Sequence, residues 1–96
     1  MMGRDQFLLN LLMEECAEVQ QEASKCNRFG LDEQMNSDTP PNKQRLINEV
    51  NDFYAILCLL EREFGIDFIP NEDKIKSKLE KIERYYQYSK SLGRVK

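Results

Sequence analysis

The chain is organised around two short acidic stretches, Glu14-Glu15-Cys16-Ala17-Glu18 and Glu49-Val50-Asn51-Asp52. Each contains two acids three residues apart, and residues at that spacing share one face of an α-helix. The face that carries the acids is otherwise apolar. It comprises Leu8, Leu11, Leu12, Glu15, Glu18, Val19 and Glu22 in the first stretch, and Leu46, Glu49, Asp52, Phe53, Ile56, Leu57 and Leu60 in the second. The pattern predicts two amphipathic helices that bring carboxylates into an apolar interface.

Carboxylates in such an interface are costly unless something compensates them, and several carboxylates that converge also repel one another. Mg²⁺ prefers carboxylate oxygens and removes both penalties. The sequence has no histidine, which argues against a di-iron site of the Glu-x-x-His type and leaves Mg²⁺, with Mn²⁺ as an alternative. The spacing alone leaves a second interpretation open, an ion-pair network with Lys25, Lys43 or Arg45.

The fold class expected from the pattern is all-α, with a single domain over residues 1–96. Helical periodicity and stop signals predict a bundle of three main helices, over about 4–28, 42–64 and 71–92. Gly30 and Gly65 are expected to end the first two helices, and Asn42 is expected to cap the second. The apolar segment 66–70 is expected to pack on the core. The third helix has an apolar stripe of Ile75, Leu79, Ile82, Tyr85, Tyr86 and Ser89.

Residues 30–41 form the longest predicted loop, which contains the pair Pro40-Pro41. Proline opposes helix continuation, so the loop separates the first two helices. Loops of this length are often functional or mobile. A plain connector and a lid over a substrate are equally compatible with the sequence.

The balance of charges and the cysteines restrict the class of protein. The chain has 17 acidic and 14 basic residues and a net charge of −3, which argues against a nucleic-acid binder and against a polybasic membrane patch. The three cysteines, Cys16, Cys26 and Cys58, form no C-x-x-C pair and are expected to be small buried side chains in a reducing compartment. No targeting or membrane segment is visible, so we expect a cytoplasmic protein.

A chain of 96 residues can bury only a modest core. Leucines lie on two adjacent stripes of the first helix, at Leu8, Leu9, Leu11 and Leu12, which indicates two packing partners. We therefore expect a homodimer or a larger homo-oligomer, with a four-helix core completed by dimerisation.

Four segments together resemble the MazG-like, all-α nucleoside triphosphate pyrophosphohydrolases. They are residues 14–19, residues 24–30 with Arg28-Phe29-Gly30, residues 48–52, and residues 84–89 followed by Gly93. The resemblance implies hydrolysis of a nucleoside triphosphate to the monophosphate and pyrophosphate, and it implies a dimer or a tetramer. It also implies that the magnesium ligands are Glu15, Glu18, Glu49 and Asp52. Asn51, where many relatives have a small residue, is a mild departure that does not affect a ligand.

Under this resemblance Glu15 and Glu18 are the catalytic candidates, and Glu18 is the candidate base for a water molecule. Lys25 and Arg28 either reach the triphosphate or complement the carboxyl end of their helix. Glu14 is either a supporting acid or a solvated one.

Lys81 and Tyr85 on the third helix are candidate contacts for a phosphate and a base, with a solvated lysine and a packed tyrosine as the alternatives. Two other functions compete with hydrolysis. One is a non-catalytic helical dimer that binds nucleotide or Mg²⁺ and regulates a partner, and the other is a purely structural helical protein.

Overall fold

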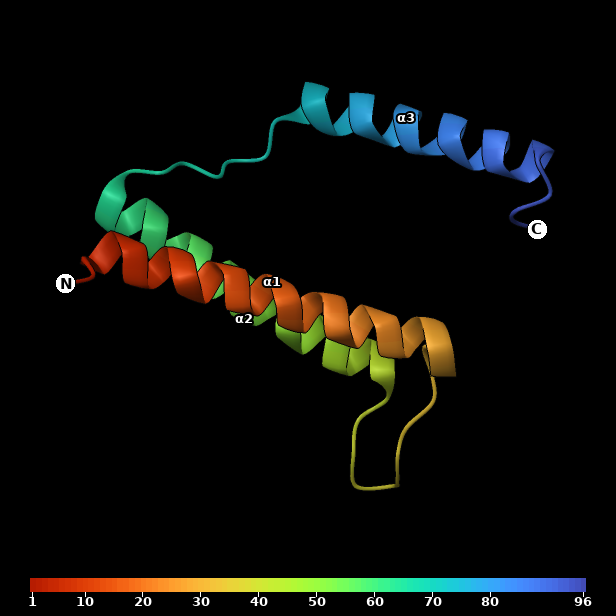
Figure 1. Ribbon diagram of the computed structural model, residues 1–96, viewed down its shortest axis with the longest axis horizontal. Coiled ribbons are helices and arrows are strands. Elements are labelled where there is room, and N and C mark those ends of the chain that lie inside the picture. Colours follow the sequence, from red (N-terminus) through yellow and green to blue (C-terminus); the bar gives the residue numbers. More distant parts are fainter.

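The computed structural model describes all 96 residues and contains three α-helices and no strand (Figure 1). The helices are α1 (Arg4–Phe29), α2 (Asn42–Phe64) and α3 (Glu72–Ser91). The all-α class and the predicted helix bounds are therefore confirmed to within a residue or two. None of the three helices combines the length and the apolar composition needed to cross a bilayer.

Local sequence signals explain where the helices end. Gly30 follows α1 with a φ of 101°, and its N–H donates to the Cys26 carbonyl at 2.9 Å. Gly65 follows α2 in the left-handed region, with a φ of 67°, and its N–H donates to the Glu61 carbonyl at 3.0 Å. Both positions require a backbone that residues with a Cβ rarely adopt, so both glycines stop their helices as predicted.

The prediction that Asn42 caps α2 is wrong. Pro41 occupies the capping position with a φ of −58°, and Asn42 is the first helical residue. The buried Asn42 side chain instead donates to the Gly30 carbonyl at 3.0 Å and to Glu33 Oε2 at 2.8 Å. Because Pro41 occupies the capping position, the side-chain amide of Asn42 is free to close the 30–41 loop at its base.

The helices α1 and α2 form an antiparallel hairpin (Figure 1). Leu8, Ile56 and Leu60 are buried in the seam between them, and Leu11, Leu12 and Leu59 pack around this core. At the open end of the hairpin, Arg4 donates to both carboxylate oxygens of Glu63, at 2.9 and 3.0 Å. The apolar faces predicted for these two helices therefore meet each other.

The third helix does not join this hairpin. It packs against neither α1 nor α2 and lies apart from them (Figure 1). The prediction that segment 66–70 packs on the core is wrong, since Phe68 and Ile69 are exposed. Pro70 disfavours a helical backbone at Ile69, so residues 65–71 form an extended connection between α2 and α3. A bundle of three helices is consequently not formed within one chain. The expected burial of the cysteines is also wrong, since Cys16 and Cys58 are exposed and Cys26 is only partly buried, because the hairpin leaves their sides of α1 and α2 uncovered.

A candidate metal centre between α1 and α2

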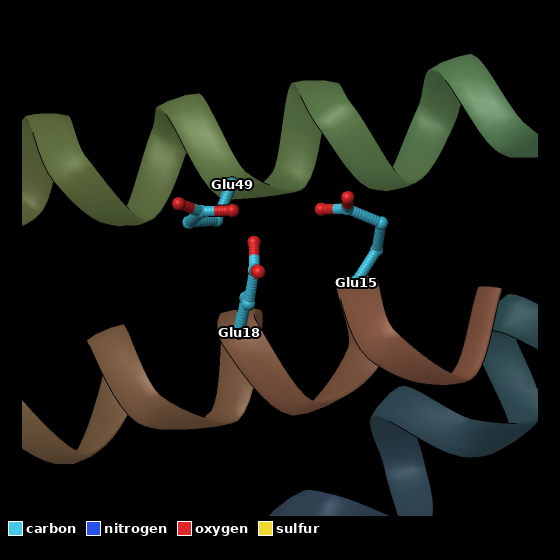
Figure 2. A group of neighbouring side chains, drawn as sticks. All are labelled: Glu15, Glu18 and Glu49. Carbon is cyan, nitrogen blue, oxygen red and sulfur yellow. The ribbon is translucent and has the colours of Figure 1, made fainter. Parts of the chain in front are cut away.

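Three glutamates converge in the middle of the hairpin (Figure 2). Glu15 and Glu18 project from α1, and Glu49 projects from α2 towards them. One carboxylate oxygen of each residue lies within 4.8 Å of the others. Glu15 and Glu18 share a helical face because they are three residues apart, and the antiparallel packing brings Glu49 opposite that face. The arrangement provides three oxygen ligands from two separate elements.

The interior of this cluster is short of hydrogen-bond donors. Glu15 Oε2 and Glu49 Oε2 are both buried, and neither has a hydrogen-bond partner. Buried polar atoms are nearly always paired, and leaving a charged one unpaired is costly. Glu18 is exposed, so the cluster opens to solvent on its side. Two unpaired oxygens that face the same small space are the feature that a bound cation satisfies.

The pKa values of two of these acids also indicate that the cluster lacks compensating positive charge. The pKa of Glu15 is raised, first by burial and then by the negative charges of Glu18 and Asp52. The pKa of Glu49 is also raised, first by a shared hydrogen bond with Glu18 and then by burial. Both shifts mean that the ionised carboxylates are poorly compensated by the protein itself.

The ion-pair alternative applies to a different acid. No Lys or Arg forms a salt bridge with Glu15, Glu18, Glu49 or Asp52. The nearby cations bind the buried Glu22 instead, with Arg45 Nε at 3.4 Å from Oε2 and Lys25 Nζ at 3.4 Å from Oε1. The sequence pattern predicts Glu22 on the apolar face of its helix, but the sequence analysis names no partner for this acid. Glu22 follows Glu18 by four residues and so lies on the same face, which was the signal in the sequence that it also faces α2.

The fourth predicted ligand, Asp52, lies at the edge of the cluster. It is exposed and is not one of the three acids whose oxygens converge. Its negative charge nevertheless contributes to the raised pKa of both Glu15 and Glu49, because it lies close enough to repel their ionised forms. The structure therefore brings three of the four predicted ligands together and leaves the fourth beside them.

The predicted substrate-binding residues are distributed over two separate elements. Lys25 and Arg28 lie on α1 beyond the cluster, where Lys25 donates to Glu22 and the Arg28 guanidinium lies 5.0 Å from the centre of the Phe29 ring. Lys81 and Tyr85 are on α3, which does not approach the hairpin. Within one chain, only Lys25 and Arg28 share an element with the acidic cluster.

The residues present fit a hard divalent cation. The cluster supplies only carboxylate oxygens, two of them buried and unpaired, and Mg²⁺ and Mn²⁺ prefer such ligands. Comparisons with known protein families, with curated proteins and with solved structures find no match for this sequence. Fold and site together define an all-α protein with a carboxylate cluster between two antiparallel helices.

Proposed function

We propose that the protein is a Mg²⁺-dependent nucleoside triphosphate pyrophosphohydrolase of the MazG-like kind, which converts a nucleoside triphosphate and water to the monophosphate and pyrophosphate. The observation that carries the proposal is the convergence of Glu15, Glu18 and Glu49, with two buried oxygens unpaired and no protein cation among them. The sequence resemblance supports the reaction, and the geometry supports the metal.

The chemistry divides the acids by their exposure. Glu15 and Glu49, whose inner oxygens are buried, would hold the cation, and Asp52 would reach in from the edge. When bound, the cation neutralises the charge of the triphosphate and of the acids that face it. Glu18 is the most exposed of the three converging acids, so its carboxylate is the one best placed to accept the proton of an attacking water.

The surrounding cations favour Arg28 over Lys25 as the phosphate contact. Lys25 already donates to the buried Glu22, so recruiting it would leave that carboxylate with Arg45 alone. Arg28 is exposed and forms no salt bridge. Its guanidinium can bind a phosphate through two hydrogen bonds at once. Lys81 and Tyr85 are proposed as contacts for a phosphate or a base, and they require a second chain because α3 of the same chain lies away from the hairpin.

The proposal includes self-association into a homodimer or a homotetramer. One chain buries only three apolar side chains, Leu8, Ile56 and Leu60. A core of that size is small for a stable domain of 96 residues.

The direct test is a pyrophosphate-release assay on the full chain with a panel of ribo- and deoxyribonucleoside triphosphates in Mg²⁺, with both products identified by chromatography. We expect a monophosphate and pyrophosphate from at least one nucleotide. Glu15→Gln and Glu49→Gln should abolish this release, whereas Glu61→Gln, an exposed acid of α2 outside the cluster, should not. A chain that hydrolyses none of the nucleotides, but is still stabilised against heat by Mg²⁺, would instead be the non-catalytic binder.

A further inference from the structure

The helix α3 carries an apolar face that neither α1 nor α2 covers, and its own chain meets this face only at the C-terminal end, where Tyr86 Oη donates to the Lys96 carbonyl at 2.6 Å. Ile75, Leu79, Ile82 and Tyr86 follow one another at spacings of four, three and four residues, so they lie on one side of the helix. Their exposed fractions are 47%, 61%, 52% and 40%. An amphipathic helix that is isolated in water is only marginally stable, and packing of its apolar face normally supplies most of its stability.

The hairpin carries a complementary groove between α1 and α2. Its lining is entirely apolar, its hollow measures about 330 Å³, and it is formed by Cys16, Val19, Val50, Phe53, Tyr54 and Leu57. Successive helical residues are about 100° apart, so Cys16 and Glu18 lie on nearly opposite sides of α1. The same holds for Tyr54 and Asp52 on α2. The groove can therefore be filled while the acidic cluster stays open.

We propose that α3 of one chain docks in the groove of a second copy, which returns its own α3 in the same way. Such a reciprocal exchange closes with two-fold symmetry and leaves neither surface uncovered. Electrostatics favour it, since residues 72–96 carry 8 basic and 4 acidic side chains while residues 1–71 carry 6 basic and 13 acidic ones. Segments of opposite net charge attract each other and align more readily.

The connection between α2 and α3 is shaped for this exchange. Residues 65–71 are exposed and contain no helix. Pro70 favours an extended Ile69, and the Ile69 N–H donates to Asp67 Oδ1 at 2.9 Å. The connection thereby holds α3 beside its own hairpin but clear of it, so that a second chain can reach its apolar face (Figure 1).

The size of the surfaces fits a second copy of the chain. A helix of 20 residues is about 30 Å long and about 10 Å wide, which offers a strip of roughly 300 Å². If α3 lies along the hairpin over its full length, two docked helices, counted with both surfaces of each contact, bury at most roughly 1,200 Å², the lower end for a specific interface. A chain with only three buried apolar side chains needs a partner that covers its apolar surfaces as soon as it folds. A second copy of the same chain meets this need, because the same gene product supplies both.

Disulfide trapping tests the exchange directly, because the exposed Cys16 already lines the groove. In a full-length background with Cys26→Ser and Cys58→Ser, a second thiol is introduced on the apolar face by Ile75→Cys, Leu79→Cys or Ile82→Cys, one at a time. Gln87→Cys, on the polar flank of α3 about 100° from Tyr86, is the matched control, and the background with Cys16 alone reports pairing of that residue with itself. After mild oxidation, we expect at least one of the three variants to give a covalent dimer on a non-reducing gel, at least tenfold more than either control.

Two results would overturn the exchange. A fast-migrating cross-linked monomer would mean that α3 folds back on its own hairpin. A failure of all three variants to exceed the controls would mean that another surface covers the groove. As a second measurement, Leu79→Asp should shift the sedimentation profile of the full chain from dimer to monomer, while Gln87→Asp should not. Identical profiles for these two variants would also contradict the proposal.

Discussion

A carboxylate oxygen of Glu15 on α1 lies within 4.8 Å of one of Glu49 on α2, and each of these residues has a buried oxygen without a hydrogen-bond partner. Two like charges in that position repel, and the protein supplies no cation to separate them. The seam of the hairpin is therefore less stable than its apolar packing alone would make it. A divalent cation bound between the two carboxylates would remove this repulsion.

The first prediction concerns that relief. Mg²⁺ should stabilise the folded chain, because a ligand that binds only the folded state at a hundredfold excess over its Kd adds about 2.7 kcal/mol. In metal-free buffer Glu49→Gln should raise the melting temperature, since it removes one of the repelling charges. The same variant should lose most of the response to Mg²⁺. Thermal unfolding with chelator and with added Mg²⁺ measures both effects.

The control for this experiment is Glu61→Gln, which removes an exposed acid from the same helix. It should leave the response to Mg²⁺ unchanged. A wild-type melting temperature that does not depend on Mg²⁺, Mn²⁺ or chelator would exclude a metal site of useful affinity.

The second prediction is a pH dependence in the absence of metal. The pKa values of Glu15 and Glu49 are raised above the ordinary value of 4.5 by burial and by the facing acids Glu18 and Asp52. Between 4.5 and the raised values, the folded chain binds protons that the unfolded chain has already released. The free energy of unfolding should therefore fall as the pH rises through this window. Urea unfolding from about pH 4.5 to about pH 8 in chelator checks the slope.

The Glu63 carboxylate does not obscure that slope. Hydrogen bonds from Arg4 lower the pKa of Glu63, so its stabilising contribution is lost only as the pH falls below the ordinary value of 4.5. A double variant, Glu15→Gln with Glu49→Gln, should flatten the dependence above 4.5. If the double variant keeps the wild-type slope, other groups are responsible for it.

The third prediction compares two ion pairs that differ in burial. Arg45→Met leaves the carboxylate of Glu22, 8% exposed, with Lys25 as its remaining cation, and should cost about 1–3 kcal/mol of stability. Lys43→Met breaks a shorter contact, 2.6 Å to Asp32, in which both side chains are more than half exposed. That change should cost under about 1 kcal/mol. Equal losses in chemical denaturation would mean that burial does not set the strength of these pairs.

The fourth prediction grades the acids by their position. Glu15→Gln removes an inner ligand and should lower kcat/KM for triphosphate hydrolysis by at least about a hundredfold. Asp52→Asn, at the edge of the cluster, should cost less, about ten- to a hundredfold, because three converging carboxylates remain. Steady-state kinetics over a range of Mg²⁺ concentrations separates a loss of metal affinity from a loss of turnover. An Asp52→Asn effect as large as that of Glu15→Gln would place Asp52 among the inner ligands.

Local signals in the sequence predict the helix ends well. Gly30 and Gly65 stop their helices because each adopts a positive φ that disfavours other residues. Asn71 accepts a hydrogen bond from the Lys74 N–H at 2.9 Å and starts α3. Asn42 is the exception, because Pro41 occupies the capping position and the Asn42 side chain donates across the loop to the Gly30 carbonyl. Capping is decided within a few residues, whereas that contact joins segments twelve residues apart.

The candidate site was predictable only as two separate pairs. Helical periodicity determines that Glu15 and Glu18 share a face and that Glu49 and Asp52 share another. It does not determine the rotation and axial shift of one helix against the other. These quantities depend on how Leu8, Ile56 and Leu60 interlock in the seam. That packing brings Glu49 into the cluster, leaves Asp52 at its edge, and turns Glu22 towards Arg45.

By itself, the sequence of this protein determined three amphipathic helices, their ends and the faces on which the acids lie, since all of these depend on neighbours within about one turn. Only the tertiary structure decided which acids meet, which acid receives the arginine, and that α3 stays apart from the hairpin. The physical reason is that contacts between helices depend on side-chain packing and on the direction of the connecting backbone, and no local period encodes either.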